Sequence, residues 1–284
     1  MSTADPGDAH VLGVLLSELI DDAALFPPGD APMAEAVPAH LRHDAGPYFG
    51  MLGRFLCPVS KLGELHLTLP QDEDLPLGLI ADTGFDGLRA AFDAVDGDER
   101  YILEAAEIRH PGDRLAELEE RLPYGCEVYV EVPHADMRAL LPTLAGHEHF
   151  RAKLRTGGLT AESFPTPQEV AEFLVGCADL ELGLKCTAGL HRAVRRTDPV
   201  TGFTYHGFLN ILLAAVRASD GRDLPDVQAV LEIEDDSAVA AAVRALTVED
   251  AARTRNLFHG FGSCSFTEPI EDLIALGLIP EVRN

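Results

Sequence analysis

The sequence predicts an α/β fold: a single (β/α)8 TIM barrel over residues 1–284, with a helical insert after its seventh strand. Eight apolar, strand-like segments alternate with helical segments, and each connection is long enough for a parallel crossover. The length and the hydrophobic content of 46% suit one large barrel. The first strand is followed by Phe26-Pro-Pro-Gly29, whereas an open doubly wound sheet usually has a glycine-rich phosphate loop there.

The expected strands are short apolar segments bounded by polar, proline or glycine residues. They lie at residues 19–26, 54–60, 76–83, 101–108 and 126–133, in two segments that carry Lys153 and Lys185, and at residues 258–266. The most regular one, residues 126–133, alternates three valines with polar side chains. In a barrel the valines would face the outer helices, so Glu131 would point inward near the carboxyl end of its strand.

Helical patterns fill the intervening segments. They cover residues 33–43, 85–95, 113–122, 136–144, 167–178, 208–218, 237–246, 248–255 and 269–276. After the seventh strand the rhythm changes, because residues 192–204 form a long polar loop that leads into Thr204-Tyr-His-Gly207. We expect residues 192–255 to form a lid-like helical insert whose loop covers the barrel mouth and brings His206 near it.

Composition and charge limit the possible partners. The net charge of −25 disfavours nucleic acid and anionic membranes, and no apolar run is long enough for a membrane span. The acidic amino terminus lacks the basic region of a signal peptide, so we expect a cytoplasmic protein. Five scattered cysteines without a CxxC pair indicate neither a disulfide framework nor a structural zinc site.

The chain has 22 basic residues but only three lysines, Lys61, Lys153 and Lys185. Lysine can lose its proton when it is desolvated and then act as a nucleophile or base, which arginine cannot. Two lysines on adjacent parallel strands would repel one another, and this repulsion favours a neutral amine on one of them. The alternative is that these strand-end lysines only bind anions or pair with buried carboxylates.

Because active sites of such barrels lie at the carboxyl ends of the strands, the candidate residues are those at the strand ends. The candidate catalytic residues are Lys153, Lys185, Glu131 and Asp82, with Glu107 an alternative to Glu104 on the fourth strand. The candidate substrate-binding residues are Lys61, Glu104, Arg155, Thr156, Gly157, Gly158, Thr187, Gly189, His191, His206, Gly262 and Ser263. The Asp21-Asp22 pair at the first strand is better explained by a helix cap or a salt bridge than by catalysis.

Three motifs resemble those of deoxyribose-phosphate aldolase and its class I aldolase relatives. They are Lys153-Leu-Arg-Thr-Gly157, Lys185-Cys-Thr-Ala-Gly-Leu-His191 and Phe261-Gly-Ser-Cys-Ser265, in the family's order on strands six, seven and eight. The resemblance implies that Lys153 forms a Schiff base, that Lys185 tunes it and that the last motif holds a phosphate. Arg155, Ala188 and His191 depart from the family pattern, and the insert is longer than the family's.

From these features we expect a lyase or aldolase that forms a Schiff base with a small anionic carbonyl compound, an oxo acid or a sugar phosphate, without a metal or other cofactor. Two alternatives stay open. A metal-dependent isomerase or hydrolase would bind its metal through histidines 191, 206 and 259 with Glu104, Glu107 or Glu131, although no HxH or HExxH spacing is present. A Ser-His-Asp hydrolase is disfavoured because the sequence has no GxSxG elbow. A non-catalytic barrel would bind an anion through Lys153, Arg155 and the backbone at residues 157–158. The sequence is compatible with a homo-oligomer as well as with a monomer.

Overall fold

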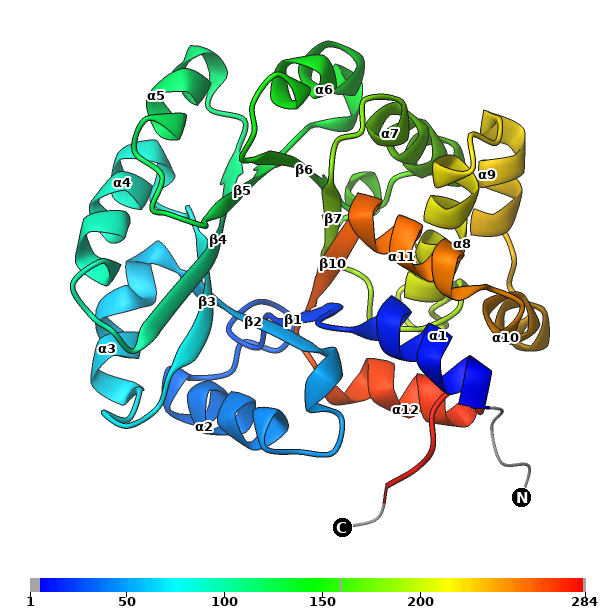
Figure 1. Ribbon diagram of the computed structural model, residues 1–284, viewed down its shortest axis with the longest axis horizontal. Coiled ribbons are helices and arrows are strands. Elements are labelled where there is room, and N and C mark those ends of the chain that lie inside the picture. The colour runs from blue at the N-terminus through cyan, green and yellow to red at the C-terminus, as the bar shows by residue number, and fades with distance from the viewer. Residues whose placement is uncertain (1–5, 159, 283–284) are drawn as a thin grey trace.

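Eight parallel strands close into a barrel in the computed structural model, which describes residues 6–158 and 160–282. Around the barrel the strands follow the order β1-β10-β7-β6-β5-β4-β3-β2, and helices surround them (Figure 1). The barrel strands are β1 (Ile20–Asp22), β2 (Leu52–Pro58), β3 (Leu75–Ile80), β4 (Tyr101–Arg109), β5 (Glu127–Glu131), β6 (Phe150–Arg155), β7 (Leu184–Thr187) and β10 (Phe258–Ser263). The predicted α/β barrel is thereby confirmed.

The helices pack on the outside of the barrel (Figure 1). They are α1 (Pro6–Leu16), α2 (Met33–Asp44), α3 (Leu62–Thr68), α4 (Gly84–Val95), α5 (Leu115–Glu119), α6 (Met137–Ala145), α7 (Pro167–Asp179), α8 (Phe208–Ser219), α9 (Leu224–Leu231), α10 (Asp236–Arg244), α11 (Val248–Leu257) and α12 (Thr267–Ala275). None of the helices described here is long and apolar enough to cross a membrane.

Local sequence signals explain where several helices begin. Thr166 and Glu169 form a capping box at the start of α7, where Pro167 occupies the first turn. Thr247 and Asp250 form the same reciprocal cap on α11. Asp223 accepts a hydrogen bond from the backbone N–H of Asp226 and so begins α9, a helix that the apolar periodicity of the sequence did not reveal.

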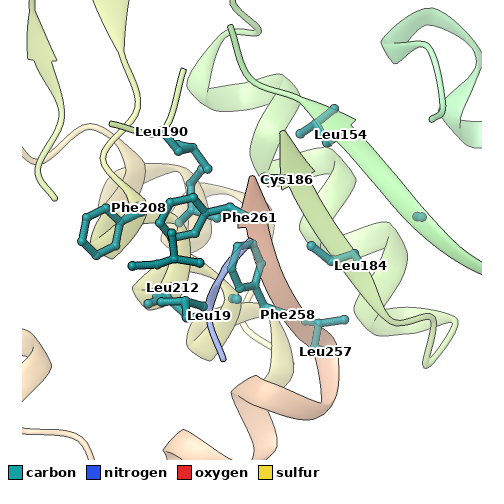
Figure 2. Close-up of a cluster of buried hydrophobic side chains, with 14 of the residues drawn as sticks. Leu19, Leu154, Leu184, Cys186, Leu190, Phe208, Leu212, Leu257, Phe258 and Phe261 are labelled. Carbon is teal, nitrogen blue, oxygen red and sulfur yellow. The ribbon is translucent and has the colours of Figure 1, made fainter. Parts of the chain in front are cut away.

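Strand alternation separates an apolar outer face from a charged inner face. The outward residues of β5, β6 and β7 are Val128, Val130, Phe150, Ala152, Leu154, Leu184 and Cys186, all in the buried apolar core. This core continues through Phe258 and Phe261 of β10 to Phe208 and Leu212 of α8 (Figure 2). Phe208 and Phe261 stack with their ring centroids 5.2 Å apart. Since the apolar alternates are fixed against the helices, the polar alternates must point into the barrel.

The segment after β7 has two structurally different parts. Helices α8, α9 and α11 belong to the outer layer, where α8 packs on α7, α9 and α11, and α11 packs on α1. The part near the carboxyl ends of the strands is a short hairpin of β8 (Arg196–Thr197) and β9 (Thr204–Tyr205). Phe164, in the loop after β6, packs against Phe203 and Tyr205 of this hairpin. A lid function thus remains a prediction for residues 192–207, whereas α8–α11 pack as barrel helices.

The strand β1 is short, and its two carboxylates face opposite layers. Asp21 points into the barrel, while Asp22 binds His40 of α2, with 3.1 Å between Oδ2 and Nδ1. Asp22 also accepts a hydrogen bond from the backbone N–H of Ala24. The sequence predicted a longer strand at residues 19–26. It ends at Asp22 because the next residues turn, and Phe26 donates its N–H to the carbonyl of Ala23.

Candidate active site at the carboxyl end of the barrel

Two lysines lie side by side inside the barrel and share one carboxylate. Lys153 of β6 and Lys185 of β7 are register partners on adjacent parallel strands. Glu107 of β4 lies between their ammonium groups, with its Oε2 2.8 Å from Nζ of Lys153 and its Oε1 2.5 Å from Nζ of Lys185. Each oxygen of one carboxylate therefore binds a different lysine. The alternation of β6 and β7 predicted this placement of the lysines correctly.

On the mouth side, Glu131 extends the ion-pair chain. Its Oε2 is 3.0 Å from Nζ of Lys153, and its Oε1 is 3.4 Å from Nε of Arg155. Glu131 is the last residue of β5 and Arg155 is the last residue of β6, so both lie at the carboxyl ends of their strands. The expected inward position of Glu131 is thus present, and Glu131 contacts the candidate nucleophile directly.

On the inner side, Asp21 continues the chain away from Lys185. Its Oδ2 is 2.5 Å from Nζ of Lys185, and its Oδ1 accepts a hydrogen bond of 2.8 Å from the backbone N–H of Arg54. The guanidinium of Arg54 then binds Glu104, with 3.0 Å between Nε and Oε2. Cations and anions alternate along the whole chain, which runs Arg155, Glu131, Lys153, Glu107, Lys185, Asp21, Arg54 and Glu104.

This alternation sets the protonation states of the buried groups. Burial alone would raise the pKa of Glu107, but the charges of Lys153 and Lys185 outweigh it and lower the pKa to about 2. Burial would lower the pKa of Lys185, but Asp21 and Glu107 raise it above its ordinary value. Lys185 is therefore not the neutral amine of the pair, because carboxylates lie on both sides of its ammonium group.

Exposure increases along the chain from Lys185 to Arg155. The side chain of Lys185 is 1% exposed and that of Lys153 is 6% exposed, whereas Arg155 is 45% exposed. The ring of Tyr129 lies beside Lys185, whose Nζ is 5.1 Å from the ring centroid. Its hydroxyl group binds Glu127 and His259. Lys153 is thus the lysine nearer to solvent, and Lys185 is almost completely buried.

Some predicted site residues lie apart from the lysines. Asp82 is bound by the backbone N–H and the hydroxyl group of Ser60, and it forms no ion pair with Lys153 or Lys185. Glu104 lies closer to the amino end of β4 than Glu107 and binds Arg54, so Glu107 is the β4 carboxylate of the site. Lys61 follows β2 in a short 3-10 helix, and no ion pair of its ammonium group occurs among the described residues.

The residues after β6 and β7 hold the two strand ends together. The hydroxyl group of Thr156 donates to the carbonyl of Ala188 at 2.5 Å, and its backbone N–H donates to the carbonyl of Thr187. Gly157 lies so close to Gly189 that a Cβ built on Gly157 would be 2.8 Å from the Cα of Gly189. Gly189 has a φ of +77°, which glycine adopts readily. These residues shape the mouth, and Gly158 lies next to them.

The remaining candidates lie around the mouth on β7 and β10. Thr187 is the register partner of Gly262, and both lie on the inner wall. The hydroxyl group of Ser263 donates to the carbonyl of Ser265. His191 lies between Cys264 and Glu268, with its Nδ1 3.6 Å from Sγ and 3.5 Å from Oε2.

His206 is at the mouth end of the barrel but does not contact the lysine pair. Its Nε2 donates to the carbonyl of Pro165 at 2.7 Å, and its Nδ1 has no partner among the described residues. His259 lies towards the amino end, where its Nδ1 binds the hydroxyl group of Tyr129. In the part of the chain that the structure describes, no three His, Cys, Asp or Glu side chains are grouped so that they could hold a metal ion.

Two cavities lie away from the lysine pair. One of about 500 Å³ opens between α6 and α7 on the outer surface, and apolar side chains such as Leu141 and Val175 line much of it. The other, of about 310 Å³, lies at the amino end of the barrel beside Arg151 and His259. Neither is lined by a residue of the ion-pair chain.

The sequence analysis did not place Asp21, Arg54 or Tyr129 beside the two lysines and their carboxylates. A helix cap or a salt bridge was expected for the Asp21-Asp22 pair; Asp21 forms a salt bridge, but its partner was not identified from the sequence. Arg54 lies near the start of its strand, where a search restricted to carboxyl ends does not look. Tyr129 could have been found from the same alternation that placed Glu131 inside.

No protein-family model, curated protein or solved structure matches this chain. The function is therefore inferred from the geometry of the site.

Proposed function

We propose that this chain is a Schiff-base-forming lyase or aldolase that acts on a small anionic carbonyl compound. The observation that carries the proposal is the pair of buried lysines that share Glu107, with Lys153 on the side nearer to the mouth. A TIM-barrel interior is usually packed with branched apolar side chains, and buried charges are costly to keep. Clusters of buried ionisable groups with shifted pKa values are frequent at functional sites.

Lys153 is the better candidate for the nucleophile. Lys185 is bound on both sides by Asp21 and Glu107, which stabilise its ammonium form. Lys153 is less buried and contacts Glu131, a carboxylate that is itself partly open to the mouth. A base beside an amine and near solvent can remove a proton and return it, directly or through a water molecule.

In the proposed reaction, Lys153 transfers one proton to Glu131 and attacks the carbonyl carbon with its free electron pair. The resulting carbinolamine loses its hydroxyl group as water, which takes up the proton from Glu131, and a protonated imine remains. Glu131 then takes the proton of the hydroxyl group on the carbon that departs, this carbon leaves as an aldehyde as the C–C bond breaks, and the electron pair of that bond moves into the iminium group to form an enamine. Glu131 returns the proton to the enamine carbon, and hydrolysis of the resulting imine by water releases the second product and frees Lys153. Lys185 stays an ammonium ion in this scheme and holds Glu107 in its ionised form.

Reductive trapping tests this proposal directly. The protein would be incubated with small oxo acids and sugar phosphates in the presence of cyanoborohydride, and the modified lysine mapped by mass spectrometry. Because the chain has only three lysines, each possible adduct is easily assigned. We expect the adduct on Lys153, and its loss in Lys153→Arg while anion binding is retained. If Lys153→Arg keeps turnover, Lys153 serves only as an anion clamp, and the imine mechanism is ruled out.

A further inference from the structure

Glu131 connects the most exposed cation of the ion-pair chain to the candidate nucleophile. One of its oxygens binds Arg155 at 3.4 Å, and the other binds Lys153 at 3.0 Å. The guanidinium of Arg155 is therefore one carboxylate away from the reacting amine. Whatever displaces Arg155 from Glu131 changes the charge beside Lys153 without touching Lys153 itself.

The contact between Arg155 and Glu131 is weaker by geometry than the contacts that the two lysines make in the chain. Its distance of 3.4 Å is longer than the 2.5–3.0 Å of the lysine contacts, and Arg155 is 45% exposed. Exposed ion pairs of this kind contribute little to stability because water screens them. A phosphate or carboxylate group that binds a guanidinium through two oxygens can compete with such a contact.

A second arginine lies at the same side of the mouth. Arg109 is the last residue of β4, it is exposed, and its register partner on β5 is Glu131. The described residues provide no ion-pair partner for its guanidinium group. Most other arginines on the barrel strands already bind carboxylates, as Arg54 and Arg151 do. Arg109 and Arg155 thus flank Glu131 from β4 and β6.

The groups that face Glu131 set its affinity for a proton. Lys153 and Arg155 contact it from β6, Arg109 neighbours it on β4, and Glu107 reaches it only through the shared Lys153. Burial raises the pKa of Glu131, and the charges of Lys153 and then Arg155 lower it to below the ordinary value. Removing the charge of Arg155 from its oxygen therefore makes Glu131 a stronger base.

We propose that the anionic group of the substrate binds Arg155 and Arg109, draws Arg155 away from Glu131 and thereby lets Glu131 accept the proton of Lys153. This inference rests on the proposed Schiff-base function and adds to it how the nucleophile is activated. The substrate's own charge then creates the free amine that attacks its carbonyl group. Between substrates the proton stays on Lys153, and the enzyme discriminates against neutral carbonyl compounds.

The test uses the full-length protein and a neutral carbonyl probe, dihydroxyacetone, with cyanoborohydride near pH 7. The rate of adduct formation on Lys153 is measured with and without inorganic phosphate, and separately with acetate, which distinguishes the two anion classes. In the wild-type protein we expect at least one of the two anions, phosphate or acetate, to accelerate adduct formation on Lys153. Glu131→Gln should lose this acceleration, because the amide cannot accept the proton.

The decisive variant is Arg155→Gln, whose side chain is exposed enough for the fold to tolerate the change. It removes the charge from Glu131 permanently, so it should react with dihydroxyacetone ~10-fold faster than wild type, as for a change of one pKa unit, and should not respond to phosphate. Arg155→Lys should retain the response, and Arg109→Gln should need more phosphate for it. Arg138→Gln, an exposed arginine on α6, is the matched control and should behave as wild type.

The outcomes separate this inference from the proposed function. If no probe gives an adduct on Lys153 in the wild-type protein, the Schiff-base function itself fails. If the adduct forms but Arg155→Gln reacts no faster than wild type, only the activation by the substrate's anion is refuted. An equal acceleration by phosphate in wild type and Arg155→Gln would mean that phosphate acts as a buffer catalyst, which also refutes it. Circular dichroism and thermal unfolding verify that each variant is folded.

Discussion

Lys153 and Lys185 are register partners whose ammonium groups bind opposite oxygens of the same carboxylate. Two cations on adjacent strands would otherwise repel one another in a buried site. Glu107 removes this repulsion and fixes both side chains towards the barrel axis. The arrangement should make Glu107 important for stability as well as for the proposed chemistry, and the two contributions can be measured separately.

Replacing Glu107 by glutamine should strongly destabilise the protein. The substitution keeps the shape of the side chain but leaves two buried ammonium groups with one fewer counter-charge, which typically costs about 3–5 kcal/mol. Urea unfolding followed by circular dichroism measures this loss. The control is Glu117→Gln, which removes a carboxylate paired with Arg89 and Arg114 on the surface and should destabilise the protein far less than Glu107→Gln, because exposed ion pairs contribute little to stability. Equal effects of the two substitutions would contradict the buried network.

Stability should fall in acid because of the buried carboxylates. Glu107 and Glu127 each have a pKa of about 2 in the folded protein, against an ordinary value of 4.5. A carboxylate whose folded pKa is lowered stabilises the protein above its unfolded pKa, and this stabilisation is lost as the pH falls towards the folded value. We expect the free energy of unfolding to decrease between about pH 5 and pH 2. Glu107→Gln should show a shallower decrease over this range than wild type.

The fold was predictable from the sequence because strand alternation and βα rhythm are local patterns. The same alternation places Lys153, Lys185 and Glu131 inside the barrel. On a regular strand, residues three apart face opposite sides, so alternation allows only one of Glu104 and Glu107 to point inward. The sequence pattern of this strand did not indicate which of the two it is. A register shift between Leu77 and Gly78 of β3 leaves one extra residue on β4, so both glutamates can point inward.

The ion pair of Asp21 could not be predicted from local sequence patterns. The strand β1 has three residues, which is too short for an alternation to reveal its inner face. Its partner Lys185 lies 164 residues further along the chain, and only closure of the barrel brings the two together. The contact of Arg155 with Glu131 likewise depends on side-chain geometry at the mouth, which no local pattern encodes.

The close approach of two glycines predicts a steric effect at the mouth. Gly157→Ala should destabilise the protein by about 1–3 kcal/mol, because the new methyl group would collide with the backbone of Gly189. Gly63→Ala provides the comparison, since a Cβ on Gly63 of α3 meets nothing within 4 Å. Alanine is favoured over glycine in a helix by about 1 kcal/mol, so this variant should be as stable as wild type or more stable. Thermal and urea unfolding of both variants provide the measurement.

The hairpin after β7 should depend on Phe164 for its order. The ring centroid of Phe164 is 5.0 Å from that of Phe203 and 4.9 Å from that of Tyr205. Aromatic contacts of this kind contribute about 1 kcal/mol beyond the buried area. Phe164→Ala should therefore speed amide hydrogen exchange at residues 196–205 while the barrel strands stay protected. Phe49→Ala, which removes an exposed ring from a distant segment, should leave exchange in the hairpin unchanged.

The consecutive carboxylates of β1 have a consequence for how the barrel closes. Asp21 binds Lys185 on the inner side, and Asp22 binds His40 on the helix side. A slip of one residue in the pairing of β1 would turn each carboxylate towards the wrong layer, where its partner side chain is absent. Apolar residues of neighbouring strands are interchangeable in such a slip, but the partners of these two carboxylates are not. The adjacent charges therefore specify the registry of a strand that is too short to specify it by hydrophobic pattern.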